Sequence, residues 1–403
     1  MAASAIGVVC GLIGTMFHFG VHEVTAFRGS HPWVLYLLPL AGFVIVSFYK
    51  LTETDGLGTD DIIDAVHEGK RLPILLLPAI FFGTVLTHLC GGSAGREGAA
   101  LQMGGTIGQC MGRTFRLDDR DLRVATLAGM AAFFSALFGT PLAATVFAIM
   151  VISIGVLYHV ALYPSLLAAL VAYGVSVRLG VEPTRFTVAV PDQSVGMFVR
   201  VAALGVLCAL VSILFCKLMH GAGHLMKRIK NPWLRVICGG FAVIALTWIF
   251  GTDYNGAGMD IVTRAIEQET VAVPWAFLLK LVFTAVTLAA GFKGGEVVPS
   301  FFVGATFGCA VSPLLGLPVG FGAAVGLAAV FCGVTNCPVA STLLAVELFG
   351  AEGMLYFALA CCLSYMLSGY QGLYSSQTIL YSKLKAQFIN VHTNAYHAGE
   401  KTE

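Results

Sequence analysis

The chain has 403 residues, of which 57% are hydrophobic and 11% are charged, and its mean hydropathy is +0.85. Soluble globular chains are about 45–50% apolar and about 25% charged, so this composition excludes an ordinary soluble enzyme and a disordered chain. The formal net charge of +1 gives no reason to expect a nucleic-acid partner. We therefore expect an all-α polytopic membrane protein in a lipid bilayer. The 11 cysteines fall in apolar runs without metal-type spacing, so we expect buried thiols rather than disulfides.

Apolar segments recur along the whole chain. They fall at about 4–22, 32–51, 73–90, 99–112, 124–138, 141–180, 197–219, 234–250, 272–290, 297–314, 318–334, 338–350 and 353–369. A full crossing of a bilayer takes about 20 helical residues, so several of these segments are too short to cross it alone. We expect broken and tilted helices, followed by a cytoplasmic C-terminal helix and tail at about 375–403.

The sequence repeats itself at an offset near 200 residues. The matching segments are Gly56-Leu-Gly-Thr-Asp60 with Gly256-Ala-Gly-Met-Asp260, Gly104-Gly-Thr-Ile-Gly108 with Gly304-Ala-Thr-Phe-Gly308, and Gly129 to Pro141 with Gly326 to Pro338. Three matching pairs of segments in the same order indicate a duplication. We expect one transmembrane domain over residues 1–403, with repeat 1 at about 1–180, a linker at about 181–196, repeat 2 at about 197–374, and no additional soluble domain.

The chain has 47 glycines, and some of them gather in clusters at 55–60, 91–98, 291–295 and 304–308. Small residues either pack membrane helices together or break them, and we expect these clusters mainly to mark breaks. Duplicated transporters place their substrate near the midplane, where the N-termini of half-helices point at anionic groups. Unpaired N–H groups and the helix dipole form an anion site there without a fixed positive charge.

With these motifs the chain resembles the CLC family of anion channels and anion/proton antiporters, over almost its whole length. The matching motifs are Gly56-Leu57-Gly58-Thr59-Asp60, Gly95-Arg96-Glu97-Gly98, Gly291-Phe292-Lys293-Gly294-Gly295-Glu296-Val297-Val298-Pro299 and Leu373-Tyr374-Ser375. The resemblance implies a CLC-type fold with two inverted-topology repeats, and a homodimer with one pore in each subunit. It implies anion binding by Leu57, Gly58, Gly95, Arg96, Gly98, Val297, Val298 and Tyr374. The phenol of Tyr374 can donate to an anion, although an interfacial aromatic anchor is the alternative.

Departures from the chloride-type pattern direct the resemblance to one branch. Leu57 stands where chloride-type members usually carry a serine, and Val151 stands where chloride/proton exchangers carry an internal glutamate. The third motif carries Lys293 and Glu296, which most chloride members lack. These features resemble the CLC-F branch of bacterial fluoride/proton antiporters, in which the glutamate matching Glu296 is implicated in proton handling. Val298 departs from that branch, which often has a threonine there.

Two carboxylates carry the expected mechanism. A charged side chain at membrane depth costs about 2.5–3.5 kcal/mol or more, so Glu97 is a functional candidate by default. Its carboxylate can occupy an empty anion site and leave it on protonation, which moves anion and proton in opposite directions. The alternative is a structural partner for Arg96. Glu296 is expected to relay the proton in place of the carboxylate missing at Val151, and the alternative is a buried ion pair with Lys293.

The sequence therefore predicts a secondary active fluoride/proton antiporter that exports fluoride across the bacterial inner membrane. A CLC-type chloride/proton antiporter and a chloride channel are the alternatives. The expected partners are fluoride, or alternatively chloride, and protons. We expect no enzymatic activity, no cofactor and no bound metal.

Several other polar residues are expected to be structural. Glu347 lies in an apolar run and is expected to accept backbone amides, and Thr140 and Asn336 precede prolines like helix N-caps. His18 and His22 are four residues apart, which allows a metal pair, but we favour an interfacial location. The acidic residues after the first glycine motif are expected to form a solvated face near a vestibule: Asp60, Asp61, Asp64 and Glu68.

Overall fold

A computed structural model describes residues 1–270, 273–385 and 387–394. These residues contain sixteen α-helices. The first half has α1 (Ala2–Ser30), α2 (Leu38–Leu51), α3 (Thr59–Glu68), α4 (Leu76–Leu89), α5 (Glu97–Thr114), α6 (Asp119–Phe138), α7 (Pro141–Met150) and α8 (Leu162–Arg178). The second half has α9 (Val195–Met226), α10 (Pro232–Phe250), α11 (Met259–Glu267), α12 (Ala276–Ala290), α13 (Val297–Leu315), α14 (Val319–Thr335), α15 (Pro338–Phe349) and α16 (Met354–Leu367).

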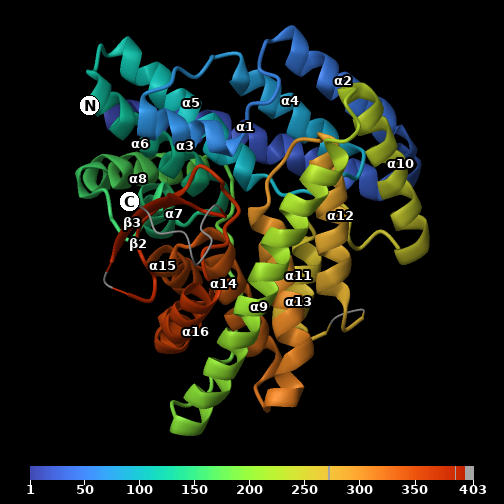
Figure 1. The fold of residues 1–403 in the computed structure, drawn as a ribbon, viewed down its shortest axis with the longest axis vertical. Helices are drawn as coiled ribbons and strands as arrows, with labels where there is room; N and C mark the ends of the chain where they lie inside the picture. The colour runs from blue at the N-terminus through green and yellow to red at the C-terminus, as the bar shows by residue number, and fades with distance from the viewer. Residues whose placement is uncertain (271–272, 386, 395–403) are drawn as a thin grey trace.

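The two halves contain equivalent helices in the same order, which agrees with the predicted duplication. α5 packs on α6 as α13 packs on α14, and α1 packs on α6 and α8 as α9 packs on α14 and α16. The chain between α8 and α9 forms no helix, where the linker is predicted. In Figure 1 the blue-to-green half fills most of the upper part of the molecule, and α10 of the other half lies beside α2.

Helix length follows the predicted mixture of full and partial spans. Seven helical segments of the described chain are long and apolar enough to cross a membrane, and they include α1, α6, α9 and α13. Other apolar helices, such as α4, α7 and α15, have only 10–17 residues. Short helices of this kind end inside the protein, where neighbouring elements can satisfy their free backbone groups.

The glycine clusters are of two kinds, and one expectation about them is wrong. The clusters at 55–60, 91–98 and 291–295 lie at breaks before α3, α5 and α13, as predicted. The cluster at 304–308 lies inside the continuous helix α13. A Cβ on Gly304 would lie 2.4 Å from the carbonyl oxygen of Gly326 on α14, and one on Gly104 would lie 2.3 Å from that of Gly129 on α6. These glycines therefore let two helix backbones touch.

Replacing Gly129 by Ala is expected to destabilise the protein by about 1–3 kcal/mol, as overpacking does. The new Cβ would lie 2.0 Å from the carbonyl oxygen of Gly104. Gly174→Ala in α8 is the matched control, because nothing lies within 4 Å of its Cβ position. There the helix propensity of alanine favours the variant by about 1 kcal/mol. Thermal unfolding in detergent compares the two, and equal melting temperatures would contradict the close helix contact.

The chain after α16 forms strands, so the predicted C-terminal helix is wrong for the described residues. β2 (Thr378–Tyr381) pairs in parallel with β1 (Ser153–Ile154) and antiparallel with β3 (Phe388–His392). Ile379 is buried between them in a small apolar cluster. The pairing with β1 joins residues far apart in sequence, which local amphipathicity does not reveal. The predicted tail at 395–403 lies outside the described residues.

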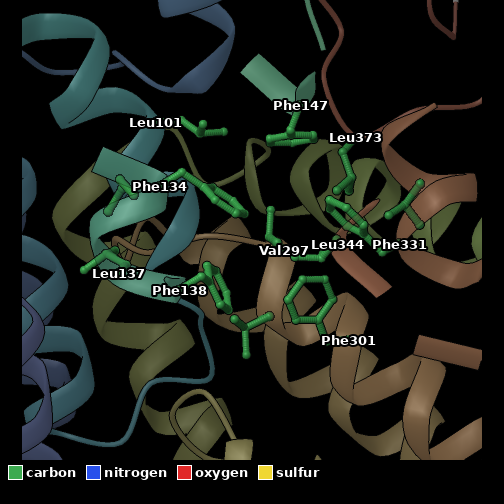
Figure 2. Packing of buried hydrophobic residues seen from close by; sticks show 14 of the residues in the cluster. Leu101, Phe134, Leu137, Phe138, Phe147, Val297, Phe301, Phe331, Leu344 and Leu373 are labelled. Carbon is green, nitrogen blue, oxygen red and sulfur yellow. The ribbon is translucent and has the colours of Figure 1, made fainter. Parts of the chain in front are cut away.

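The core lies where the two repeats meet. Figure 2 shows aromatic rings from both repeats gathered there. Phe138 on α6 contacts Phe301 on α13 at 5.8 Å between ring centroids, and Phe301 contacts Phe331 on α14 at 5.1 Å. Phe331 in turn contacts Phe147 on α7 at 5.4 Å. Aromatic contacts of this kind fix the relative positions of α6, α7, α13 and α14.

Candidate functional site

The helices α5 and α13 begin against each other. Gly95 and Gly295 form an antiparallel bridge, in which each N–H donates to the other carbonyl oxygen at 2.8 Å. A Cβ on Gly295 would lie 2.2 Å from the backbone nitrogen of Gly98, so this approach requires glycine. The first N–H groups of a helix have no partner within the helix. The bridge therefore brings two sets of free donors close together, at Glu97 and at Val297.

The first cavity, of about 320 Å³, is lined by residues from the loop before α3, from α2 and from the start of α13. It brings together four of the predicted site residues, which are Leu57, Gly58, Glu296 and Tyr374. The hydroxyl of Tyr374 is buried and has no hydrogen-bond partner in the part of the chain that the structure describes. A small hydrogen-bond acceptor in this cavity would find that donor free.

Glu97 lines a second cavity, of about 350 Å³, together with Arg96, His18, His22 and His88. Its side chain is 1% exposed. Its carboxylate Oε2 accepts the backbone N–H of Arg96 at 2.9 Å, and its Oε1 lies 3.5 Å from Arg96 Nε. The carboxylate is thus folded back onto the start of α5, and Arg96 also contacts His18 Nδ1 at 3.0 Å. The two candidate carboxylates line different cavities.

The remaining predicted residues lie between the carboxylates. Val297 and Val298 are buried in the first turn of α13. A Cβ on Gly95 would lie 3.1 Å from Val298 Cβ, and one on Gly98 would lie 2.7 Å from Gly295 Cα. These four residues are absent from the described linings of both cavities. They form the closed contact at the joined helix starts.

Glu296 stands at the N-cap position of α13 and does not form the ion pair with Lys293 that was the alternative to a proton relay. No ion pair in residues 1–270, 273–385 and 387–394 joins it to Lys293. The ammonium of Lys293 instead lies 4.0 Å from the ring centroid of Tyr49. Glu296 Oε2 lies 3.6 Å from the Cβ position of Gly98, so its carboxylate is beside the start of α5. Val151, where exchangers carry a glutamate, is fully buried at the end of α7.

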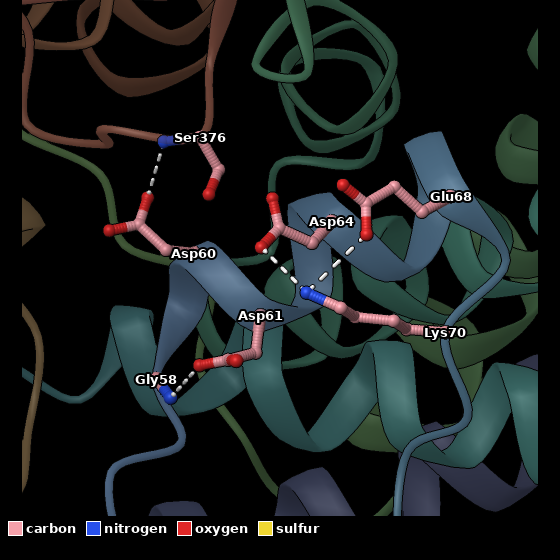
Figure 3. Close-up of polar contacts among 7 residues, drawn as sticks. All are labelled: Gly58, Asp60, Asp61, Asp64, Glu68, Lys70 and Ser376. Atoms are coloured by element: carbon pink, nitrogen blue, oxygen red, sulfur yellow. Dashed lines mark hydrogen bonds and ion pairs between the residues drawn. The ribbon is translucent and has the colours of Figure 1, made fainter.

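Asp60 and Asp61 are half-buried at the wall of the first cavity, where each holds a backbone N–H group. Asp61 accepts the N–H of Gly58 at 2.9 Å, which caps the start of α3. Asp60 accepts the N–H of Ser376 at 3.0 Å, as Figure 3 shows. The second bond ties the segment that follows Tyr374 to α3. Both carboxylates therefore lie at the wall of the first cavity, near the predicted vestibule, and each also accepts a backbone N–H.

Asp64 and Glu68 also belong to the predicted solvated face. Both lie 3.4 Å from Lys70 Nζ, and the side chain of Glu68 is 62% exposed. The two carboxylates raise the pKa of Lys70 above its usual value, Asp64 most strongly. Exposed pairs of this kind contribute little to stability.

Glu347 has the predicted structural role, whereas neither Thr140 nor Asn336 forms the predicted side-chain N-cap. Glu347 Oε2 accepts the N–H of Ala143 at 2.8 Å and its Oε1 that of Leu142 at 3.1 Å, so α15 caps the start of α7. The hydroxyl of Thr140 makes no cap. Asn336 ends α14 with φ at 61°. Thr140 occupies the N-cap position of α7, but Glu347 from a distant helix accepts the N–H groups there. The N-cap expectation is wrong for Asn336, which is the C-cap of α14 and bonds to other segments.

Two polar side chains of the first cavity had no signal in the sequence. Tyr49 lies near the end of α2, and its buried hydroxyl has no partner among the described residues. Gln102 lies on α5 and donates to Thr59 Oγ1 at 3.0 Å. Neither belongs to a glycine motif, and each reaches the cavity only through the tertiary fold.

Known proteins share both the sequence and the architecture. The family model described as voltage gated chloride channel matches residues 40–369. A protein named chloride/fluoride channel protein from Pseudomonas syringae pv. tomato is 38% identical, over 94% of this chain and 86% of its own length. The H(+)/Cl(−) exchange transporter ClcA of Vibrio campbellii is 25% identical, over 86% of this chain and 81% of its own length.

Two solved structures superpose on nearly the whole chain. A CLC-type fluoride/proton antiporter matches with a TM-score of 0.91 and 33% identity, covering 94% of this chain and 97% of its own. A slow cyanobacterial Cl−/H+ antiporter matches with a TM-score of 0.79, covering 91% and 93%, but its 19% identity supports the fold alone. The predicted all-α membrane fold of two inverted-topology repeats is confirmed by these matches.

Proposed function

The chain belongs to the CLC family, whose model is described as voltage gated chloride channel, and from this premise we propose that it is a secondary active fluoride/proton antiporter. One observation carries the proposal. Two carboxylates, Glu97 and Glu296, flank the joined starts of α5 and α13, and each lines a different cavity. Carboxylates at membrane depth are expensive and mark ion or proton pathways.

Glu97 is proposed as the gate that exchanges with the anion. Its carboxylate already accepts a backbone N–H at the start of α5, as a bound anion would. Protonation removes its charge, which weakens that bond and frees the helix start for an anion. Return of the carboxylate then displaces the anion and leaves the proton on the other side. This exchange moves one proton across the membrane in the direction opposite to the anion.

Glu296 is proposed to carry the proton between Glu97 and the first cavity. It lies at the start of α13, on the cavity side of the Gly95–Gly295 bridge, and no lysine or arginine of the described chain pairs with it. Val151 offers no carboxylate at the end of α7. A proton that enters from this cavity therefore has Glu296 as its nearest acceptor at the joined helix starts.

The anion is proposed to bind between Tyr374 and the first turn of α13, and to pass from there to the start of α5 when Glu97 leaves it. Tyr374 offers a free hydroxyl, and the backbone N–H groups of Val297 and Val298 belong to the unpaired donors of the helix start. Gly58 contributes less than its motif suggests, because its N–H already donates to Asp61. Leu57 offers no side-chain donor. The proposed roles of Gly95, Arg96 and Gly98 are to shape the helix start.

Fluoride is proposed as the physiological anion. The protein named chloride/fluoride channel and the solved fluoride/proton antiporter are both more than 30% identical to this chain, and the chloride/proton exchange transporter is 25% identical. That last relative supports chloride/proton antiport as the second candidate. We further propose a homodimer in a bacterial inner membrane, with fluoride exported as protons enter.

Flux from liposomes tests the substrate and the coupling. Purified protein is reconstituted into vesicles loaded with fluoride or with chloride, and anion efflux is recorded together with proton uptake. The proposal predicts fluoride efflux with simultaneous proton uptake and much slower chloride efflux. Chloride efflux as fast as fluoride efflux would contradict the choice of anion. Fluoride efflux without proton movement would identify a channel instead.

A further inference from the structure

The first cavity contains a hydrogen-bond donor that the proposed central anion site does not use. Tyr49 is 1% exposed, and its hydroxyl is one of the buried polar groups without a partner in the described chain. The same side chain lines the cavity that contains Leu57, Glu296 and Tyr374. Buried donors are almost always paired, so an unpaired one at a cavity wall indicates an acceptor that enters the cavity.

A cation is held over the ring of Tyr49. The ammonium of Lys293 lies 4.0 Å from the ring centroid of Tyr49, and Lys293 lines the same cavity. Helix α4 holds both side chains. A Cβ on Gly83 would lie 3.1 Å from Lys293 Cγ and 3.2 Å from Tyr49 Cε2, and the N–H of Lys293 donates to Thr87 Oγ1 at 3.2 Å. The ring and the ammonium therefore form a fixed pair.

Of the three acidic residues that line the cavity, Asp60 and Asp61 are engaged by backbone donors, and Glu296 is the proposed proton carrier. Asp60 accepts the N–H of Ser376, and Asp61 accepts the N–H of Gly58. Among the described residues that line the cavity, Lys293 is the one lysine or arginine, and no ion pair of the described chain includes it. Tyr49 and Lys293 thus contribute one hydroxyl and one ammonium to the lining of the cavity. Their O–H and N–H groups without a partner in the described chain can donate to a small anion.

We infer that Tyr49 and Lys293 form a second anion subsite, which receives fluoride before it reaches Tyr374 and Glu296. This inference rests on the proposed fluoride/proton antiport. A phenolic O–H and an ammonium are strong donors to a small anion, and together they replace part of its hydration shell. The subsite draws the anion into the cavity with a single cation. The central site, with helix N–H groups and one hydroxyl, then receives it.

Transport kinetics in liposomes test the subsite. Fluoride efflux is measured over a range of loaded fluoride for Tyr49→Phe and Lys293→Met. Tyr36→Phe removes an exposed tyrosine hydroxyl outside the cavity, and Lys50→Met removes another cation, which lies 3.8 Å from the Trp233 ring centroid. We expect the KM for fluoride to rise about tenfold in each subsite variant, as for loss of a hydrogen bond to a charged group. The maximal rate and the number of protons per fluoride stay near wild type, and both controls match wild type.

Lys293→Arg separates charge from packing, because it keeps the cation. We expect it to restore most of the fluoride affinity that Lys293→Met loses. If the wild-type protein exchanges fluoride for protons but the KM for fluoride is unchanged in Tyr49→Phe and Lys293→Met, the subsite is overturned and the antiport stands. A wild type that moves no protons with fluoride overturns the proposed function instead. If Tyr49→Phe does not fold, the two Lys293 variants decide, and a fall in maximal rate at constant KM in Lys293→Met contradicts the subsite.

Discussion

Replacing Glu97 by Gln is expected to abolish proton coupling while the protein keeps its fold. Glutamine keeps the size of the side chain and can still accept the N–H of Arg96, whose distance to the carboxylate is 2.9 Å. It resembles the protonated glutamate permanently, so it never carries a proton across. Removing a group that transfers protons lowers the rate of that transfer by about a hundredfold or more. Proton uptake that accompanies fluoride efflux in liposomes is the measurement.

The control for this variant is Glu347→Gln. Glu347 is also a carboxylate in an apolar run that accepts backbone N–H groups, at Leu142 and Ala143, but it caps α7 and lines neither cavity. We expect this variant to retain coupled exchange and to lose stability only. Coupled exchange at the wild-type rate in Glu97→Gln would show that Glu97 is not the gate.

Replacing Glu296 by Gln is expected to slow proton transport by about a hundredfold while fluoride affinity changes little. The side chain lies beside the start of α5, and no described lysine or arginine neutralises it, so its loss removes a proton carrier rather than an ion pair. Proton flux and fluoride flux are recorded in the same vesicles, and fluoride binding is measured by calorimetry in detergent.

Asp60→Asn is the matched control within the same cavity. Asp60 lines that cavity, and the amide oxygen of asparagine can still accept the N–H of Ser376. The variant therefore removes a negative charge without removing the bond, and we expect wild-type coupling. If Glu296→Gln instead lost its fold, or lost proton and fluoride transport in equal measure with unchanged stoichiometry, a structural role at the start of α13 would replace the relay.

The two predictions together describe a proton path through the joined helix starts. Glu97 lies on one side of the Gly95–Gly295 bridge with Arg96, and Glu296 lies on the other side with the first cavity. The closed contact at this bridge keeps the cavities apart. In the proposed antiport, the anion and the proton pass through groups that bind them, which is what coupling requires.

The local motifs predicted the helix starts because glycine and N-terminal donors act over a few residues. Gly95-Arg96-Glu97-Gly98 indicated the start of α5, and the glycines before Glu296 indicated the start of α13. Their assignment to different cavities was not predictable, because it depends on how two halves about 200 residues apart in sequence meet at Gly95 and Gly295. Tyr49 shows the same limit, since only the tertiary fold places it at the first cavity, in contact with Lys293.

Two errors have a common physical cause in long-range contact. The glycines at 304–308 pack against α14 instead of breaking a helix, because Gly326 brings a second backbone within reach. The segment at 378–381 forms β2 instead of a helix, because Ser153 and Ile154 offer a strand edge. In each case the local composition allowed two structures, and a partner distant in sequence decided between them.

Uphill fluoride movement driven by a pH gradient is the most direct test of coupled antiport. Vesicles contain the same fluoride concentration inside and outside, the membrane potential is held at zero, and the outside is made acidic. The account predicts that protons entering through the protein drive fluoride out, so internal fluoride falls below external fluoride. Passive leakage of hydrogen fluoride moves fluoride the other way. Vesicles with Glu97→Gln are the control, and in them we expect internal fluoride to stay equal or rise. The same result with wild-type protein would contradict the antiport mechanism.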